Sequence, residues 1–123
     1  MGFKERGKIL RESNYLDLHP IRLIDFEQDE KGLLTLIIPK FENKFFVKYF
    51  VPYMKSPNVK LKLDELGSAA WLAIDGKKSV EEISNELTVK FGEKIQPAEE
   101  RLTSFLSQLY EQRIITFEEI KGV

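Results

Sequence analysis

The chain has 123 residues, 42% of them apolar and 32% charged, which fits one small domain with a modest core. Its formal net charge of -1 and pI near 5.9 lack the basic excess through which most free-standing nucleic-acid binders contact phosphate. The absence of cysteine excludes disulfides, thiolate zinc sites, iron–sulfur clusters and a cysteine nucleophile. No apolar run reaches the length of a signal peptide or a membrane-spanning helix, so we predict a cytoplasmic protein.

The first 39 residues predict a charged N-terminal segment followed by a β-hairpin. Residues 1–18 are weakly patterned, which is typical of a partly flexible segment or a short helix. A polar turn at 28–32 joins two apolar runs, and Pro39 ends the second strand because proline cannot donate to a ladder. The first run contains Ile21, Leu23, Ile24 and Phe26, and the second contains Leu33, Leu34, Leu36, Ile37 and Ile38.

Residues 40–58 form an aromatic insert in which lysines alternate with phenylalanines and tyrosines. Phe41, Phe45 and Tyr49 are four residues apart, which predicts a short helix with one aromatic face, followed by a turn. Three interpretations remain open for the insert: extra core, an interface to a partner or a second copy, or a contact with a membrane surface or nucleic acid. The short length and Pro52 argue against a membrane helix. The predicted interface residues are Phe45, Phe46, Tyr49, Phe50 and Tyr53.

The remainder predicts a strand, three helices and a short final strand. Residues 59–63 alternate apolar residues with Lys60 and Lys62, which is typical of a half-buried strand at a sheet edge. The first helix follows Asp64 as N-cap and stops at Gly76 in the left-handed conformation. The second starts with a capping box at 79–82, and the third starts near Pro97. Residues 114–117 then predict a short strand, or wing.

Two aromatic side chains and one acidic run have mainly structural interpretations. Trp71 is predicted to anchor the core, with a place in a binding groove as the alternative. His19 is the single histidine and cannot build a metal site or a triad alone. Glu81, Glu82 and Glu86 fit a capping box and a solvated helix face better than an acid–base pair.

The element order predicts an α+β fold of the winged helix-turn-helix type. We expect a small antiparallel three-stranded sheet packed on three helices, with the aromatic helical insert between strands two and three. The predicted domain is 19–118, after an N-terminal segment at 1–18.

A strand ends in Leu-Asp-Glu at 63–65, Ala70-Trp71 lies in the helix after it, and Asp-Gly-Lys-Lys-Ser-Val-Glu-Glu-Ile occupies residues 75–83. On this ordered series, residues 59–117 resemble the PqqD family. A third helix and a short apolar ending follow in the family's order. The insert at 40–58 departs from the family pattern, in which strands two and three have a short connection.

The resemblance implies a non-catalytic peptide recognition element or peptide chaperone that serves cofactor biosynthesis or a related pathway. Family members bind the leader of a ribosomally made precursor peptide as an extra strand, beside the third helix, for a partner that is often a radical S-adenosylmethionine enzyme. Carried over, the peptide-binding residues are Val59, Lys60, Leu61, Lys62, Leu63, Arg101, Leu102, Phe105, Gln108 and Leu109. The alternative is that the strand is central or covered, with its lysines simply solvated.

Other functions fit the sequence less well. A DNA-binding winged-helix regulator would need basic and amide side chains on the helices, which instead carry many glutamates, and a protein-interaction domain built on the insert is a further alternative. No phosphate loop, nucleophile motif or metal-ligand pair is present, so we predict no enzyme activity, cofactor or metal. A homodimer stays an open alternative, and membrane and nucleic-acid partners are disfavoured.

Overall fold

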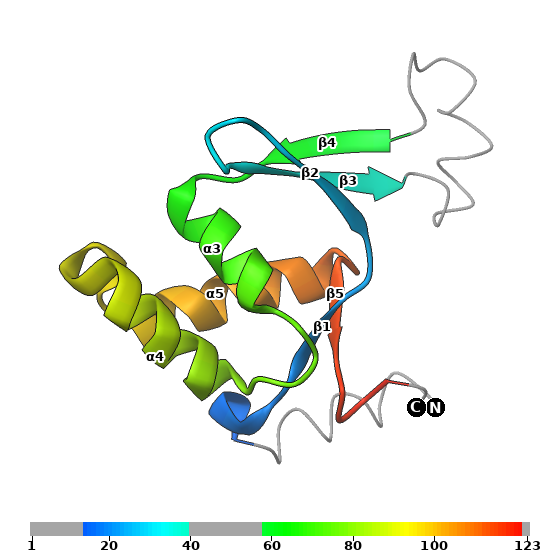
Figure 1. Ribbon diagram of the computed structural model, residues 1–123. Helices are drawn as coiled ribbons and strands as arrows, with labels where there is room; N and C mark the ends of the chain where they lie inside the picture. Colours follow the sequence, from blue (N-terminus) through cyan, green and yellow to red (C-terminus); the bar gives the residue numbers. More distant parts are fainter. Residues whose placement is uncertain (1–13, 40–57, 122–123) are drawn as a thin grey trace. The chain divides into compact units, whose positions relative to one another are not determined.

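The computed structural model describes residues 14–39 and 58–121 of the chain (Figure 1). All five predicted interface residues, and the whole predicted insert except Asn58, lie outside this range. The described residues form two compact units. The helical unit contains 14–23 and 66–121, and the sheet unit contains 24–39 and 58–65. Together they have α+β architecture with three α-helices and antiparallel sheets, as predicted; the winged-helix arrangement stays a prediction.

The sheet unit is one antiparallel sheet of three strands in the order β2-β3-β4, drawn side by side in Figure 1. Its strands are β2 (Asp25–Gln28), β3 (Leu34–Pro39) and β4 (Asn58–Lys62). The turn between β2 and β3 is closed by Asp29, whose Oδ1 accepts from the amides of Lys31 and Leu33. Gly32 follows with φ of 86°, which favours glycine.

The predicted hairpin is correct only from Asp25 onward. Pro20–Arg22 forms a separate strand, β1, which pairs with β5 (Ile115–Phe117) rather than continuing into β2. Leu23 separates β1 from β2, and its amide donates to the Ile114 carbonyl at 3.0 Å. The apolar run from Ile21 to Phe26 therefore contributes residues to two different sheets. Its sequence pattern alone does not show where the first strand ends and the second begins.

Three helices build the helical unit: α3 (Glu65–Ala73), α4 (Val80–Phe91) and α5 (Ala98–Glu111). The Ser79–Glu82 capping box is confirmed, because Ser79 Oγ accepts from the Glu82 amide and the Glu82 carboxylate accepts from the Ser79 amide, both at 3.1 Å. These hydrogen bonds lower the pKa of Glu82. Short 3-10 turns precede β1 (η1, Tyr15–Asp17) and follow α4 (η4, Gly92–Ile95).

Gly76 has the predicted positive φ, at 81°, but it does not cap α3 directly. The helix ends at Ala73, and Gly76 lies in a turn whose geometry Asp75 fixes. Asp75 Oδ1 accepts from the amides of Lys77 and Lys78 at 2.8 and 2.9 Å, which lowers the pKa of Asp75. The amide of Gly76 donates to the Pro20 carbonyl and thereby ties this turn to β1.

The core of the helical unit follows the helical and strand periodicities. Trp71 is fully buried, as its core interpretation predicted, and α5 buries a stripe of residues spaced three or four apart. Phe117 of β5 packs against the rings of Tyr15 and Tyr110, with centroids 5.6 and 5.5 Å away. The buried apolar residues of the unit include Leu18, Ile74, Val80, Ile83, Leu87, Leu102, Leu106, Leu109, Ile114, Ile115 and Ile120.

Candidate functional site

β4 is one of the two outer strands of the three-stranded sheet, with β2 at the opposite edge. Within residues 14–39 and 58–121, β4 pairs with β3 on one side only and therefore lies at an edge of the sheet. The edge position agrees with the sequence expectation for residues 59–63, although their peptide-binding role stays a prediction. A strand edge of this kind carries a row of amides and carbonyls that can pair with a further chain.

The register identifies which backbone groups of β4 point away from β3. Thr35 is opposite Lys62, and the Leu63 amide donates to the Leu34 carbonyl at 2.8 Å. Hydrogen-bonded and non-hydrogen-bonded pairs alternate along an antiparallel ladder, so Leu61 also directs its amide and carbonyl toward β3. Lys60 and Lys62 therefore direct theirs outward, away from the sheet.

The same register separates an apolar face of the sheet from a charged one. Residues directly opposite each other share a face, so Leu61 lies with Leu36, and Val59 with Ile38. Leu36 is buried, but the side chains of Val59 and Leu61 remain 44% and 41% exposed. The prediction of a half-buried strand is therefore wrong for Val59 and Leu61. Their side chains are exposed, although Leu36 on the same face of the sheet is buried.

The charged face carries both lysines of β4. Lys60 Nζ lies 3.7 Å from Glu27 Oε2 of β2, and the two side chains are 60% and 59% exposed. A pair this open to water contributes little to stability, about 0.2–1 kcal/mol. Glu27 is not among the predicted site residues, although the alternation of Asp25, Phe26 and Glu27 places its carboxylate on the lysine face.

The α5 residues of the predicted site divide between the surface and the core of the helical unit. Leu102 and Leu109 are buried within the α5 stripe, so they supply core packing rather than the apolar floor of a surface groove. Arg101 and Gln108 are exposed and Phe105 is half-buried. These three line a shallow hollow of about 360 Å³ along α5, together with Pro97, Glu100 and Ser104.

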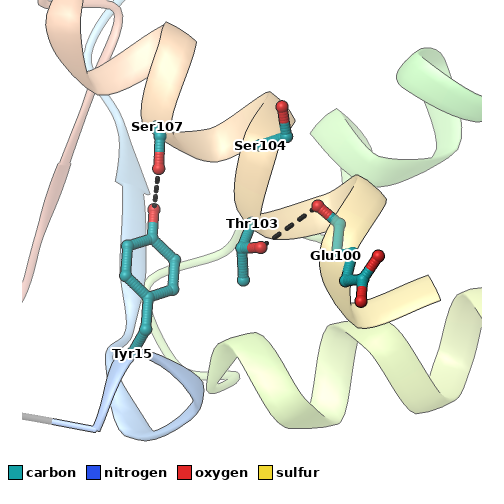
Figure 2. A pocket seen from close by; sticks show the side chains of 5 residues that line it. All are labelled: Tyr15, Glu100, Thr103, Ser104 and Ser107. Atoms are coloured by element: carbon teal, nitrogen blue, oxygen red, sulfur yellow. Dashed lines mark hydrogen bonds between the residues drawn. The ribbon is translucent and has the colours of Figure 1, made fainter. Parts of the chain in front are cut away.

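A neighbouring hollow of about 430 Å³ is lined by hydroxyl groups (Figure 2). Tyr15 of η1 reaches α5 and its hydroxyl lies 3.2 Å from Ser107 Oγ, while Thr103 Oγ1 donates to the Glu100 carbonyl. Burial raises the pKa of the Tyr15 phenol, so it stays a neutral hydrogen-bonding group. The sequence analysis placed Tyr15 in a partly flexible segment; the cap residue Asn14 before it was the available signal.

His19 has a structural contact in this fold. Its Nδ1 lies 2.7 Å from Glu119 Oε2, and its amide donates to Glu119 Oε1 at 2.8 Å. Burial alone raises the pKa of Glu119, but the hydrogen bonds from His19 outweigh that effect and hold the pKa below its ordinary value. Within residues 14–39 and 58–121, no cluster of three His, Asp or Glu side chains is arranged to hold a metal.

The surface of the helices disfavours a phosphate ligand. Glu81, Glu82 and Glu86 of α4 are exposed, and so are Glu99 and Glu100 in the first turn of α5. Their charges would repel a nucleic-acid backbone that approached these parts of α4 and α5. In the part of the chain that the structure describes, no helix has the length and apolarity needed to cross a membrane.

An edge strand with outward backbone groups is followed along the chain by three helices and a closing strand, which is the element order of a small α+β fold. The family model described as Coenzyme PQQ synthesis protein D (PqqD) matches residues 54–115, just over half of the chain, and the chain belongs to the PqqD family. The match runs from before β4 to the start of β5. Comparison with curated proteins and with solved structures gives no match.

Proposed function

We propose that the chain is a non-catalytic accessory protein that binds an extended peptide along the outer edge of β4 and presents it to a modifying enzyme. The family's description links its namesake to the synthesis of a coenzyme, and a peptide or protein partner in such a pathway is the role we extend to this chain. The observation that carries the proposal is the outward direction of the Lys60 and Lys62 backbone groups on an edge strand.

Strand addition suits this edge physically. Main-chain hydrogen bonds to β4 would supply affinity, and the side chains on its two faces would supply selectivity. Exposed Val59 and Leu61 give the incoming strand apolar surface to cover, at about 25 cal/mol per Å² of area removed from water. Arg101, Phe105 and Gln108 line their own hollow on α5 and stay proposed peptide contacts.

The test uses three capped seven-residue peptides in which leucine alternates with serine, glutamate or lysine. Each is titrated into ¹⁵N-labelled full-length protein, and amide shifts are followed by NMR. Strand addition predicts that at least one peptide shifts the amides of Lys60 and Lys62 and that binding saturates. If none of the three perturbs β4, the proposal is wrong.

A proline substitution then tests whether the backbone edge itself binds. Lys60→Pro removes an outward N–H and leaves the β3 ladder intact, since the Lys60 amide does not donate to β3. We expect this variant to fold and to lose binding of every peptide. Lys60→Ala is the matched control, because it removes the same side chain and keeps the amide; it should bind the serine peptide like the original protein. Equal binding by both variants would contradict strand addition.

A further inference from the structure

The two faces of β4 specify the pattern of the peptide that would lie beside it. Val59 and Leu61 are exposed on one face, while Lys60 and Lys62 are exposed on the other. Side chains of a strand paired with β4 fall on the same face as the residues directly opposite them, with Cβ atoms about 5 Å apart. The visiting chain therefore meets apolar surface on one side of its backbone and two ammonium groups on the other.

Resting on the proposed function, we infer that the ligand is a peptide segment in which carboxylates at positions i and i+2 alternate with apolar residues. The carboxylates lie opposite Lys60 and Lys62, and the apolar residue between them lies beside Leu61. Opposite charges across a strand pair stabilise it, and like charges directly opposite destabilise it. The order of the residues matters because adjacent side chains point to opposite faces.

Charge also argues against β4 of a second copy as the occupant. An antiparallel pair of β4 strands centred on Leu61 would place Lys60 of each chain opposite Lys62 of the other, with four ammonium groups on one face. Lysines on an edge strand commonly prevent such pairing. A neutral strand avoids this repulsion, and a strand that brings negative charge replaces it with attraction.

Glu27 shows that a carboxylate can reach this face. It approaches Lys60 from β2, across β3, at 3.7 Å. A peptide carboxylate opposite Lys60 would compete with it, since an ammonium at this exposed position gains little from Glu27 alone. Glu27→Gln removes that competitor, so we expect it to strengthen binding of the glutamate peptide by about twofold and to leave the serine peptide unchanged.

The experiment compares dissociation constants for the peptides of the same set by isothermal titration calorimetry. The original protein should bind the glutamate peptide about tenfold more tightly than the lysine peptide, because two cross-strand pairs change from attraction to repulsion. A peptide of identical composition with its glutamates contiguous should bind more weakly than the alternating one. The double substitution Lys60→Glu/Lys62→Glu should invert this preference, so that the lysine peptide binds more tightly than the glutamate peptide. It is made in the Glu27→Gln variant, because Glu27 would otherwise form a new like-charge pair. Glu27→Gln alone is the control.

The outcomes separate this inference from the proposed function. If the three alternating peptides bind equally and Lys60→Pro abolishes all binding, the edge binds peptides and the charge pattern is refuted. If none binds, both ideas fail. If the free protein self-associates in sedimentation and Lys60→Pro prevents it, the occupant is a second copy, which overturns the inference.

Discussion

The strands β5 and β4 have the same alternating pattern and opposite surroundings. Ile115 and Phe117 of β5 flank Thr116 and are each 1% exposed, whereas Val59 and Leu61 of β4 flank Lys60 and are more than 40% exposed. β5 pairs with β1 inside the helical unit and contributes its apolar residues to a core. Alternation thus predicts a strand in both cases, but it does not show whether the apolar side chains are buried, as in β5, or exposed, as in β4.

The largest expected contrast comes from truncating one apolar residue in each strand. Ile115→Ala should lower the free energy of unfolding by about 2–5 kcal/mol, because it leaves a cavity in the core. Leu61→Ala should cost less than about 1 kcal/mol, because its side chain is 41% exposed. Urea unfolding followed by circular dichroism measures both. Equal losses would show that β4 is as deeply packed as β5.

The second prediction concerns the cap at the start of α4. Ser79→Ala removes the side chain that accepts from the Glu82 amide and should cost about 1 kcal/mol in urea unfolding. Ser79→Asp supplies an equivalent acceptor and should retain most of the stability. A loss in the aspartate variant as large as in the alanine variant would mean that the cap does not explain the effect.

Acid should weaken the helical unit through its hydrogen-bonded carboxylates. The pKa values of Asp75, Glu82 and Glu119 are lowered in the fold, so the unfolded chain binds more protons than the folded chain in acid. Stability is therefore full above the ordinary glutamate pKa of 4.5 and falls as the pH drops through the lowered values. We expect the urea midpoint to decrease from pH 6 to pH 3, and Glu119→Gln to reduce that decrease. A midpoint that rises toward pH 3 would contradict the assignment.

The smallest effect should come from the ion pair on the open sheet. Glu27→Gln removes the partner of Lys60 and should change the free energy of unfolding by about 0.2–1 kcal/mol at most, since both side chains are mostly exposed. Differential scanning calorimetry at low and high salt is the measurement. A salt-dependent loss above 1 kcal/mol would mean that Lys60 holds the sheet together rather than remaining available to a peptide.

Sequence patterns predicted the elements that local chemistry fixes. The capping box at Ser79 and the spacing of Leu102, Leu106 and Leu109 identify their helices without tertiary information. The structure buries Leu102 and Leu109 in the core, although the family resemblance suggested them as peptide contacts. The break at Leu23 was not predictable, because it depends on a hydrogen bond to Ile114, which is distant in sequence.

The candidate site was predicted in part. The alternating pattern predicted that Lys60 and Lys62 share one face and that β4 lies at a sheet edge. It did not predict the exposure of Val59 and Leu61, which depends on how far the burial of the neighbouring strands extends. The outward direction of the Lys60 and Lys62 amides also required the observed register, since a shift by one residue would exchange inward and outward groups.

Amide hydrogen exchange of the free protein tests the open edge most directly. The account predicts an alternation along β4, in which the Leu61 and Leu63 amides exchange at least about tenfold more slowly than those of Lys60 and Lys62. Addition of a peptide that binds the edge should then slow exchange at the two lysines. Lysine amides already protected as strongly as Leu61 in the free protein would contradict the account, because the edge would not be available.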